Sequence, residues 1–105
     1  MCGIVGVFNL KGNSVYSSLI KTMTKQIAHR GPDSVGYYVK NNIGLGHRRL
    51  SIIDLSSAGA QPMTTKDGRY TIVFNGEIYN FKKLNSELTQ LGAVFKTNSD
   101  TETIL

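Results

Sequence analysis

The sequence contains a single cysteine and only two histidines. One cysteine cannot form a disulfide within the chain, so a disulfide-stapled fold is excluded. A zinc site needs several Cys or His ligands, and Cys2, His29 and His47 are the only ones present. No apolar stretch approaches the ~18 residues that a membrane helix needs. The first ten residues also lack the charged start and the cleavage pattern of a signal peptide. We therefore expect a cytoplasmic protein without a membrane partner.

An excess of charge of one sign is present but weak. The 105 residues include 12 Lys and Arg against 7 Asp and Glu, which gives a net charge of +5. The tight basic groups are only Arg48–Arg49 and Lys82–Lys83, whereas a nucleic-acid-binding face usually has a denser cluster with stacking aromatics. We expect a solvated surface and no nucleic-acid partner. The 40% hydrophobic content suits one small globular domain.

Hydrophobic spacing and turn residues predict a mixture of strands and helices. Strands are expected at 2–8, 35–39, 43–50, 70–74 and 93–96, with a short strand start at 52–53 inside a loop from 51 to 65. One helix should begin after a cap at Asn13 or Ser14 and end before Gly31, and a second should run from Asn80 to Gly92. Hairpin turns are expected at 41–42 and 67–68, which read Asn-Asn and Asp-Gly.

The last residues have the pattern of a further helix start. Residues 99–102 read as a capping box, in which Ser99 would bond the amide of Glu102 and Glu102 would reach back to Ser99. The sequence ends at Leu105, and a helix of about six residues is too short to be stable alone. We therefore expect the 105 residues to be a fragment of a longer protein.

Cys2 is a candidate nucleophile because of its position. A thiol needs a nearby base to become reactive. Removal of Met1 would free an α-amine on the same residue, and such amines titrate at about pH 8 and can accept the thiol proton. The alternative is that Cys2 is a small buried hydrophobic residue on a strand.

Further residues are suited to an acyl-transfer site. Asn75 and Gly76 offer a side-chain amide and a backbone N–H to a developing oxyanion, although Asn-Gly is also a common turn. Arg49 can hold a carboxylate through two parallel hydrogen bonds, or lie on the surface. Glu77 and Asp100 can bind an ammonium group; the alternatives are a solvated side chain and an acid at a helix N-terminus.

The two histidines have no clear partner in the sequence. His29 lies at a polar helix end, where a structural and a catalytic role are equally consistent with the pattern. His47 is a lone histidine in a strand, and such a residue is more often hydrogen-bonded within the fold than a ligand.

Six motifs occur in order along the whole chain: MCGIVGVF at 1–8, HRGPDSVG at 29–36, GHRRLSIIDLS at 46–56, AQPM at 60–63, FNGEIYN at 74–80 and SDTE at 99–102. Together they resemble the class II glutamine amidotransferase domain, whose nucleophile is N-terminal. The resemblance is closest to the glutaminase domain of glutamine-dependent asparagine synthetases. That branch also includes amidotransferases of sugar and polysaccharide gene clusters.

The resemblance implies a fold and a set of roles. The fold would be an α+β, αββα four-layer sandwich with antiparallel sheets, and residues 1–105 would be the N-terminal part of this type 2 domain, incomplete at its C-terminus. Cys2 would be the nucleophile, with its α-amine as the base, and Asn75 and Gly76 would form the oxyanion hole. The substrate-binding residues would be Arg49 for the α-carboxylate, Glu77 and Asp100 for the amino and amide ends, and backbone groups of Leu50, Ser51, Ile52 and Ile53.

The implied activity is hydrolysis of L-glutamine to glutamate and ammonia, without a cofactor or metal in this part of the chain. In the complete family enzyme, ammonia reaches a C-terminal synthetase domain and attacks an aspartate activated with ATP and Mg²⁺. Two alternatives remain open. One is an amidotransferase of the same branch with a different acceptor, and the other is a truncated, inactive remnant.

Overall fold

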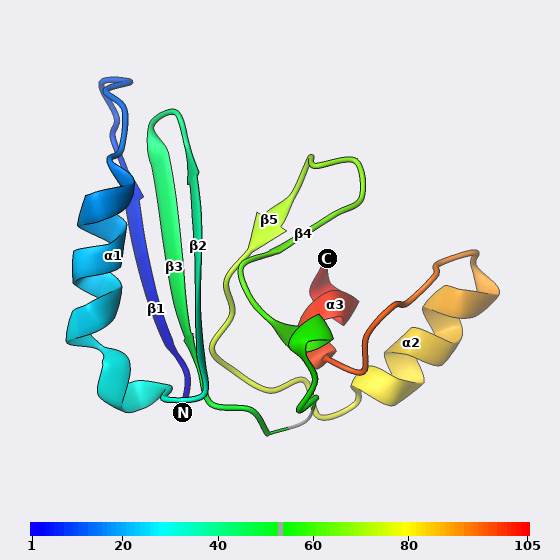
Figure 1. Ribbon diagram of the computed structural model, residues 1–105. Coiled ribbons are helices and arrows are strands. Elements are labelled where there is room, and N and C mark those ends of the chain that lie inside the picture. The colour runs from blue at the N-terminus through cyan, green and yellow to red at the C-terminus, as the bar shows by residue number, and fades with distance from the viewer. Residues whose placement is uncertain (53) are drawn as a thin grey trace.

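The computed structural model describes residues 1–52 and 54–105, and it has an α+β fold with antiparallel sheets. The larger sheet has the order β1-β3-β2 and is formed by β1 (Gly3–Phe8), β2 (Ser34–Lys40) and β3 (Ile43–Arg49). Helix α1 (Ser17–Gln26) covers one face of this sheet (Figure 1). The strands predicted at 2–8, 35–39 and 43–50 are thus confirmed, with ends shifted by one residue.

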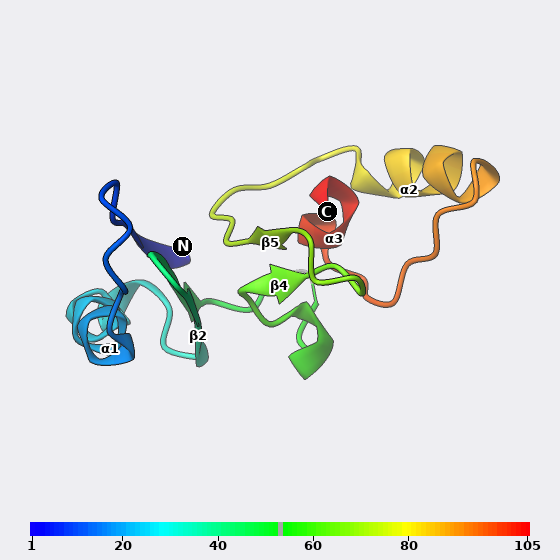
Figure 2. The ribbon, with the colours of Figure 1, turned by 90° about the horizontal axis from the view of Figure 1, so that it is seen from above.

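The elements after β3 lie on the side of the sheet opposite α1, as Figures 1 and 2 both show. They comprise the short hairpin of β4 (Met63–Thr64) and β5 (Thr71–Ile72), helix α2 (Phe81–Gln90) and helix α3 (Asp100–Ile104). Two 3-10 helices complete the list of elements, η1 (Ala28–Arg30) and η2 (Ser57–Gly59).

Helix α1 packs closely on β3 because the strand has glycines at the crossing. A Cβ added to Gly44 would lie 2.6 Å from Cγ1 of Ile20, and one added to Gly46 would collide with the hydroxyl of Thr24. Ile20 and Thr24 are fully buried. The Thr24 hydroxyl donates to the carbonyl of Ile20 at 2.6 Å, so burial of this polar group leaves it hydrogen-bonded. The core of the described chain therefore lies between α1 and this sheet.

The predicted cap of α1 is wrong. The helix begins at Ser17 after Tyr16, and no side chain caps it. The N–H of Val15 donates to the carbonyl of Asn41 at 2.8 Å, which ties the segment before the helix to the β2–β3 turn. Val15 is buried there, with 6% of its surface exposed. Its apolar side chain therefore belongs to the core although it precedes the helix.

The predicted turns are confirmed by the backbone. Asn41 has a φ of 52° between β2 and β3, and Gly68 has a φ of 72° between β4 and β5. Gly92 ends α2 with a φ of 101°, a conformation that glycine adopts without steric cost. The N–H of Gly92 donates to Thr89 and that of Ala93 to Leu88, each at 3.0 Å, so the last carbonyls of the helix are satisfied.

Of the two strand predictions in the second half, the one at 70–74 is confirmed only in part and the one at 93–96 is wrong. Residues 70–74 contribute only the two-residue strand β5, and residues 93–96 form no strand. The N–H of Lys96 donates instead to the carboxylate of Glu102 at 2.9 Å. Of the strand start at 52–53, Ile52 lies in a bend and Ile53 is outside the described residues. A strand needs a partner to form its ladder, and local apolar pattern does not supply one.

The predicted capping box is also wrong in its pairing. Ser99 is the N-cap of α3, but its hydroxyl accepts from the N–H of Thr101 at 3.2 Å. The carboxylate of Glu102 does not reach back to Ser99. It accepts from the N–H of Thr97 at 2.7 Å and from the Thr97 hydroxyl at 2.7 Å. Glu102 therefore holds the segment before the helix instead of the helix start.

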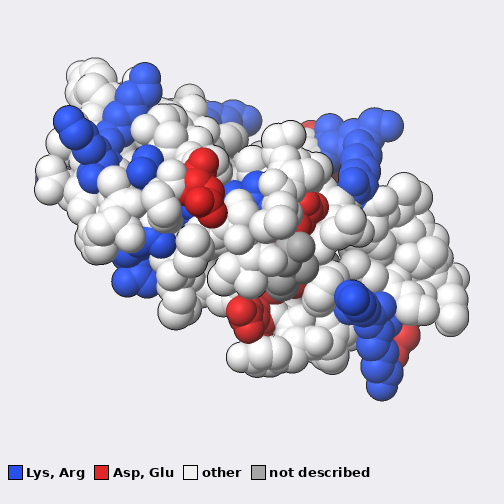
Figure 3. All heavy atoms as spheres, turned by 60° about the horizontal axis from the view of Figure 1, so that its bottom comes forward, with Lys and Arg blue, Asp and Glu red and all other residues white. Residues whose placement is uncertain are grey.

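Basic side chains lie in separate groups on the face drawn in Figure 3, as the scattered charges in the sequence indicate. Within residues 1–52 and 54–105 the one ion pair is Lys83 with Glu87, at 4.0 Å on the exposed face of α2. Among the described helices, none is long and apolar enough to span a bilayer.

Candidate active site

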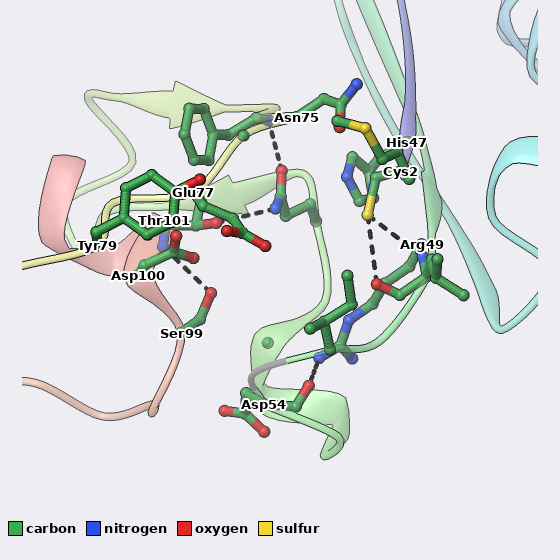
Figure 4. A pocket seen from close by; sticks show the side chains of 17 residues that line it. Cys2, His47, Arg49, Asp54, Asn75, Glu77, Tyr79, Ser99, Asp100 and Thr101 are labelled. Atoms are coloured by element: carbon green, nitrogen blue, oxygen red, sulfur yellow. Dashed lines mark hydrogen bonds between the residues drawn. The ribbon is translucent and has the colours of Figure 1, made fainter. Parts of the chain in front are cut away.

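A cavity of about 500 Å³ brings together residues that are distant in the sequence. It lies between the start of β1, the end of β3, the segment after β5 and the start of α3 (Figure 4). The predicted site residues that line it are Cys2, Arg49, Leu50, Ile52, Asn75, Gly76, Glu77 and Asp100. Ser51 does not line it, and its N–H donates to the carboxylate of Asp33 at 2.7 Å. Ile53 lies outside the described residues.

The sulfur of Cys2 is held by the backbone of Leu50. The β1–β3 register pairs Gly3 with Arg48, and continuing it by one pair sets Cys2 opposite Arg49. The N–H of Leu50 donates to the Cys2 sulfur at 3.3 Å, and the thiol can donate to the Leu50 carbonyl at 3.5 Å (Figure 4). These two contacts fix the position of the sulfur at the edge of the cavity.

Arg49 is enclosed by the loop that follows its own strand. Its guanidinium donates from Nη1 to the carbonyl of Ser56 at 2.6 Å and from Nη2 to the carbonyl of Asp54. Only 8% of the residue is exposed. A guanidinium has five N–H groups, so these two bonds orient Arg49 and leave donors for a ligand.

The carboxylate of Asp54 stabilises the same loop. Hydrogen bonds from the hydroxyl and the N–H of Ser56 lower the pKa of Asp54, and the N–H of Asn98 and the charge of Arg49 lower it further, while burial opposes them. Asp54 is therefore ionised at neutral pH beside Arg49. Its bond to Asn98 also ties the loop to the segment before α3.

Asn75 and Gly76 follow β5 and enter the cavity beside the start of α3. A Cβ added to Gly76 would lie 2.7 Å from the ring of Phe74, so a larger residue would fit there only if that ring moved. Asp100 is 5% exposed, and its carboxylate accepts from the N–H of Ile78 at 2.8 Å. Asp100 thus links the start of α3 to the segment that carries Asn75 and Gly76.

His47 is a cavity residue whose state the sequence analysis did not foresee. It is 1% exposed, and neither ring nitrogen has a hydrogen-bond partner among the described residues. The expectation of a hydrogen-bonded histidine is therefore wrong. Burial is the main cause that lowers the pKa of His47, and the positive charge of Arg49 lowers it further. The nearby backbone of Phe74 raises the pKa in part, although it forms no hydrogen bond with the ring. His47 is thus neutral near pH 7. The sequence did contain a signal that His47 lies at the cavity. His47 is two residues before Arg49 on the same strand, and residues at that spacing share a face of the sheet.

The cavity excludes His29 and includes further residues that were not predicted. His29 lies in η1 and does not line the cavity. Gln61, Tyr79 and Thr101 do line it; they belong to the motifs at 60–63, 74–80 and 99–102 but were not among the predicted site residues. Among the described residues, no group of three or more His, Cys, Asp and Glu side chains is arranged to hold a metal ion.

A family model described as a glutamine amidotransferase domain matches residues 1–105. The chain therefore belongs to the glutamine amidotransferase domain family. It is 51% identical to asparagine synthetase (glutamine-hydrolyzing) 1 of Bacillus subtilis (strain 168), over all of this chain and 17% of that protein. It is 41% identical to asparagine synthetase B (glutamine-hydrolyzing) of Escherichia coli (strain K12), over all of this chain and 19% of that protein. The chain is thus homologous to the glutaminase domains of these enzymes and spans less than a fifth of their length.

Proposed function

We propose that this chain hydrolyses glutamine to glutamate and ammonia, as the N-terminal part of a glutaminase domain, with Cys2 as nucleophile. The observation that carries the proposal is the single cavity that gathers Cys2, Arg49, Asn75, Gly76 and Asp100. The Leu50 N–H that donates to the Cys2 sulfur supports the role of this thiol. The membership of the family supports the reaction.

The proposed reaction begins with removal of Met1. Met1 lines the same cavity as Cys2, so its loss both frees the α-amine of Cys2 and empties part of the site. The amine takes the thiol proton. The sulfur then forms a bond to the carboxamide carbon of glutamine, and the electron pair of the C=O bond moves to oxygen.

The tetrahedral oxyanion would be held by the Asn75 side-chain amide and the Gly76 N–H. Collapse of this intermediate breaks the C–N bond, and the α-ammonium of Cys2 returns its proton to the departing nitrogen, so ammonia leaves. Water then attacks the thioester, the C–S bond breaks, and glutamate and the free thiol result. Every proton transferred in this reaction is carried by Cys2 or by water, and the chemistry needs no cofactor or metal.

The substrate would be oriented by charges at both of its ends. Arg49 binds the α-carboxylate with the N–H groups that its loop leaves free. Glu77 and Asp100 bind the amino and amide ends, and backbone groups of the segment 50–53 line the pocket. Support comes from the burial of Arg49 and Asp100, since charges with little exposure are screened weakly.

The complete domain is proposed to be an αββα four-layer sandwich. The face of the β1-β3-β2 sheet opposite α1 supports this completion, because Ile4 and Phe8 on that face are 48% and 61% exposed. A second sheet packed there would bury them, as sheet-on-sheet packing does. Residues 1–105 would then be the N-terminal part of the domain.

The complete protein is proposed to pass ammonia to a C-terminal synthetase domain that makes asparagine from aspartate, and ATP and Mg²⁺ would bind only there. The homology to asparagine synthetases supports this acceptor. A cytoplasmic location is proposed as well, because a reducing compartment keeps the free thiol of Cys2 available.

The test is the intact mass of the complete protein before and after exposure to an electrophilic glutamine analogue. We expect loss of Met1 and one adduct on Cys2 that excess glutamine blocks. The matched control is Cys2→Ala, which should take up no adduct and lose glutamine hydrolysis by a factor of roughly 10³ or more. Hydrolysis that survives in Cys2→Ala would contradict the proposal.

A further inference from the structure

The side-chain amide of Gln61 joins two separate segments of the site. Gln61 lies in the loop between η2 and β4 and lines the cavity. Its carbonyl oxygen accepts from the N–H of Phe74 at 2.6 Å, and its NH₂ group donates to the hydroxyl of Thr101 at 3.0 Å (Figure 4). A backbone N–H can only donate, so the first bond fixes which end of the amide faces which partner.

Both partners of Gln61 adjoin proposed site residues. The first partner immediately precedes Asn75, and the second immediately follows Asp100. Thr101 is 2% exposed, so its hydroxyl has little access to water as a replacement partner. Asp100 makes a parallel link through the N–H of Ile78. Two hydrogen-bonded connections therefore set the distance between the oxyanion donors and the start of α3.

The backbone of Gln61 packs closely against the sheet that carries Cys2. A Cβ added to Gly36 of β2 would collide with the carbonyl oxygen of Gln61 and would lie 3.0 Å from Cδ of Pro62. Gly36 pairs with His47 in the sheet register, so this contact lies beside the buried histidine of the cavity. Gln61 thus contacts the β1-β3-β2 sheet with its main chain, and it contacts the segments of Phe74 and Thr101 with its side chain.

We propose that Gln61 is a positioning residue that sets Asn75 and Gly76 at the correct distance from Asp100 and Cys2. The inference rests on the proposed glutamine hydrolysis. Gln61 would act through Phe74 and Thr101, and it needs no contact with the reacting atoms. Misplacement of an oxyanion donor weakens transition-state binding more than ground-state binding, so the effect should fall on kcat.

The experiment compares Gln61→Met and Thr101→Val with the unchanged complete protein. Met has a similar length to Gln but lacks the amide, and Val keeps the branched shape of Thr without the hydroxyl. We expect each variant to lower kcat for glutamine hydrolysis by roughly 10- to 100-fold, with KM changed less than about threefold. The double variant should be no slower than the slower single variant, because both remove one shared connection.

Two further variants distinguish a positioning role of Gln61 from a non-specific loss of structure. Thr101→Ser retains the hydroxyl that Thr101→Val removes, and it should keep kcat within about threefold of the unchanged protein. Thr71→Val removes an exposed Thr–Thr hydrogen bond in the β4–β5 hairpin and should leave kcat unchanged. If kcat is unchanged in both Gln61→Met and Thr101→Val, the inference about Gln61 is overturned, while the proposal of glutamine hydrolysis stands. If the unchanged protein shows no glutamine hydrolysis that depends on Cys2, both the proposed function and this inference are overturned.

Discussion

Gly59 lies directly against the guanidinium of Arg49, and a Cβ added to it would be 2.5 Å from Nη2. The two residues are ten positions apart, and the loop between them closes around the arginine through the carbonyls of Asp54 and Ser56. The absence of a side chain at position 59 is therefore what lets a buried arginine face the cavity.

Gly59→Ala should displace Arg49 and weaken glutamine binding. An extra methyl group in a tightly packed site costs roughly 1–3 kcal/mol, which predicts a KM for glutamine about tenfold higher. Steady-state kinetics of the complete protein would measure this change. Gly6→Ala is a matched control, because its Cβ would meet Leu45 at an ordinary 3.5 Å. Equal KM values in the two variants would contradict the packing argument.

Arg49→Lys should raise the KM for glutamine by roughly tenfold or more. Lysine has three donors on a single nitrogen and cannot hold the carbonyls of Ser56 and Asp54 while gripping a carboxylate in a bidentate way. The control is Arg48→Lys, one position earlier, whose side chain does not line the cavity. The role of Arg49 would be refuted by a KM that differs no more than in the control.

The burial of His47 should make folding stability depend on pH. The pKa of His47 is lowered in the folded protein relative to the usual 6.5, so the unfolded chain takes up the proton first as pH falls. Stability should therefore be full above pH 6.5 and decrease below it, by at most about 1.4 kcal/mol per pH unit until the folded pKa is reached. The lowered pKa of Asp54 acts in a separate range, since its contribution is lost only below the usual 3.8.

Urea unfolding of the unchanged protein and of His47→Gln, at several pH values between 7.5 and 5, would measure this dependence. Gln cannot titrate, so the variant should show a shallower decrease across that range. Parallel curves for the two proteins would show that the titration of His47 is not the cause.

Glu102 should contribute to stability through the segment before α3. Glu102→Ala removes the acceptor of the Lys96 and Thr97 N–H groups, and we expect a loss of about 1–2 kcal/mol in the free energy of unfolding. Glu87→Ala is the comparison, because Glu87 makes only an exposed ion pair with Lys83 and should change stability by no more than about 0.5 kcal/mol. Equal losses would refute the specific role of Glu102.

The amino-acid sequence predicts correctly those features that a short stretch of chain decides. Asn41 and Gly68 adopt the expected positive φ, and Gly92 ends α2 as expected, because backbone strain at one residue is a local property. The predictions were wrong where a group outside the local motif competes for the same atoms. Glu102 binds Lys96 and Thr97 instead of Ser99, and the backbone of Val15 bonds to Asn41 and delays the start of α1.

The motifs determined the family and named Cys2, Arg49, Asn75 and Asp100 as candidates, since residue chemistry and order can be read from the chain alone. Only the tertiary structure decided that Leu50 donates to the sulfur of Cys2, that His47 is buried without a partner, and that Gln61 bridges two segments. These relations join residues up to 48 positions apart. Burial and long-range hydrogen bonds arise when sheets and loops pack together, so no local pattern encodes them.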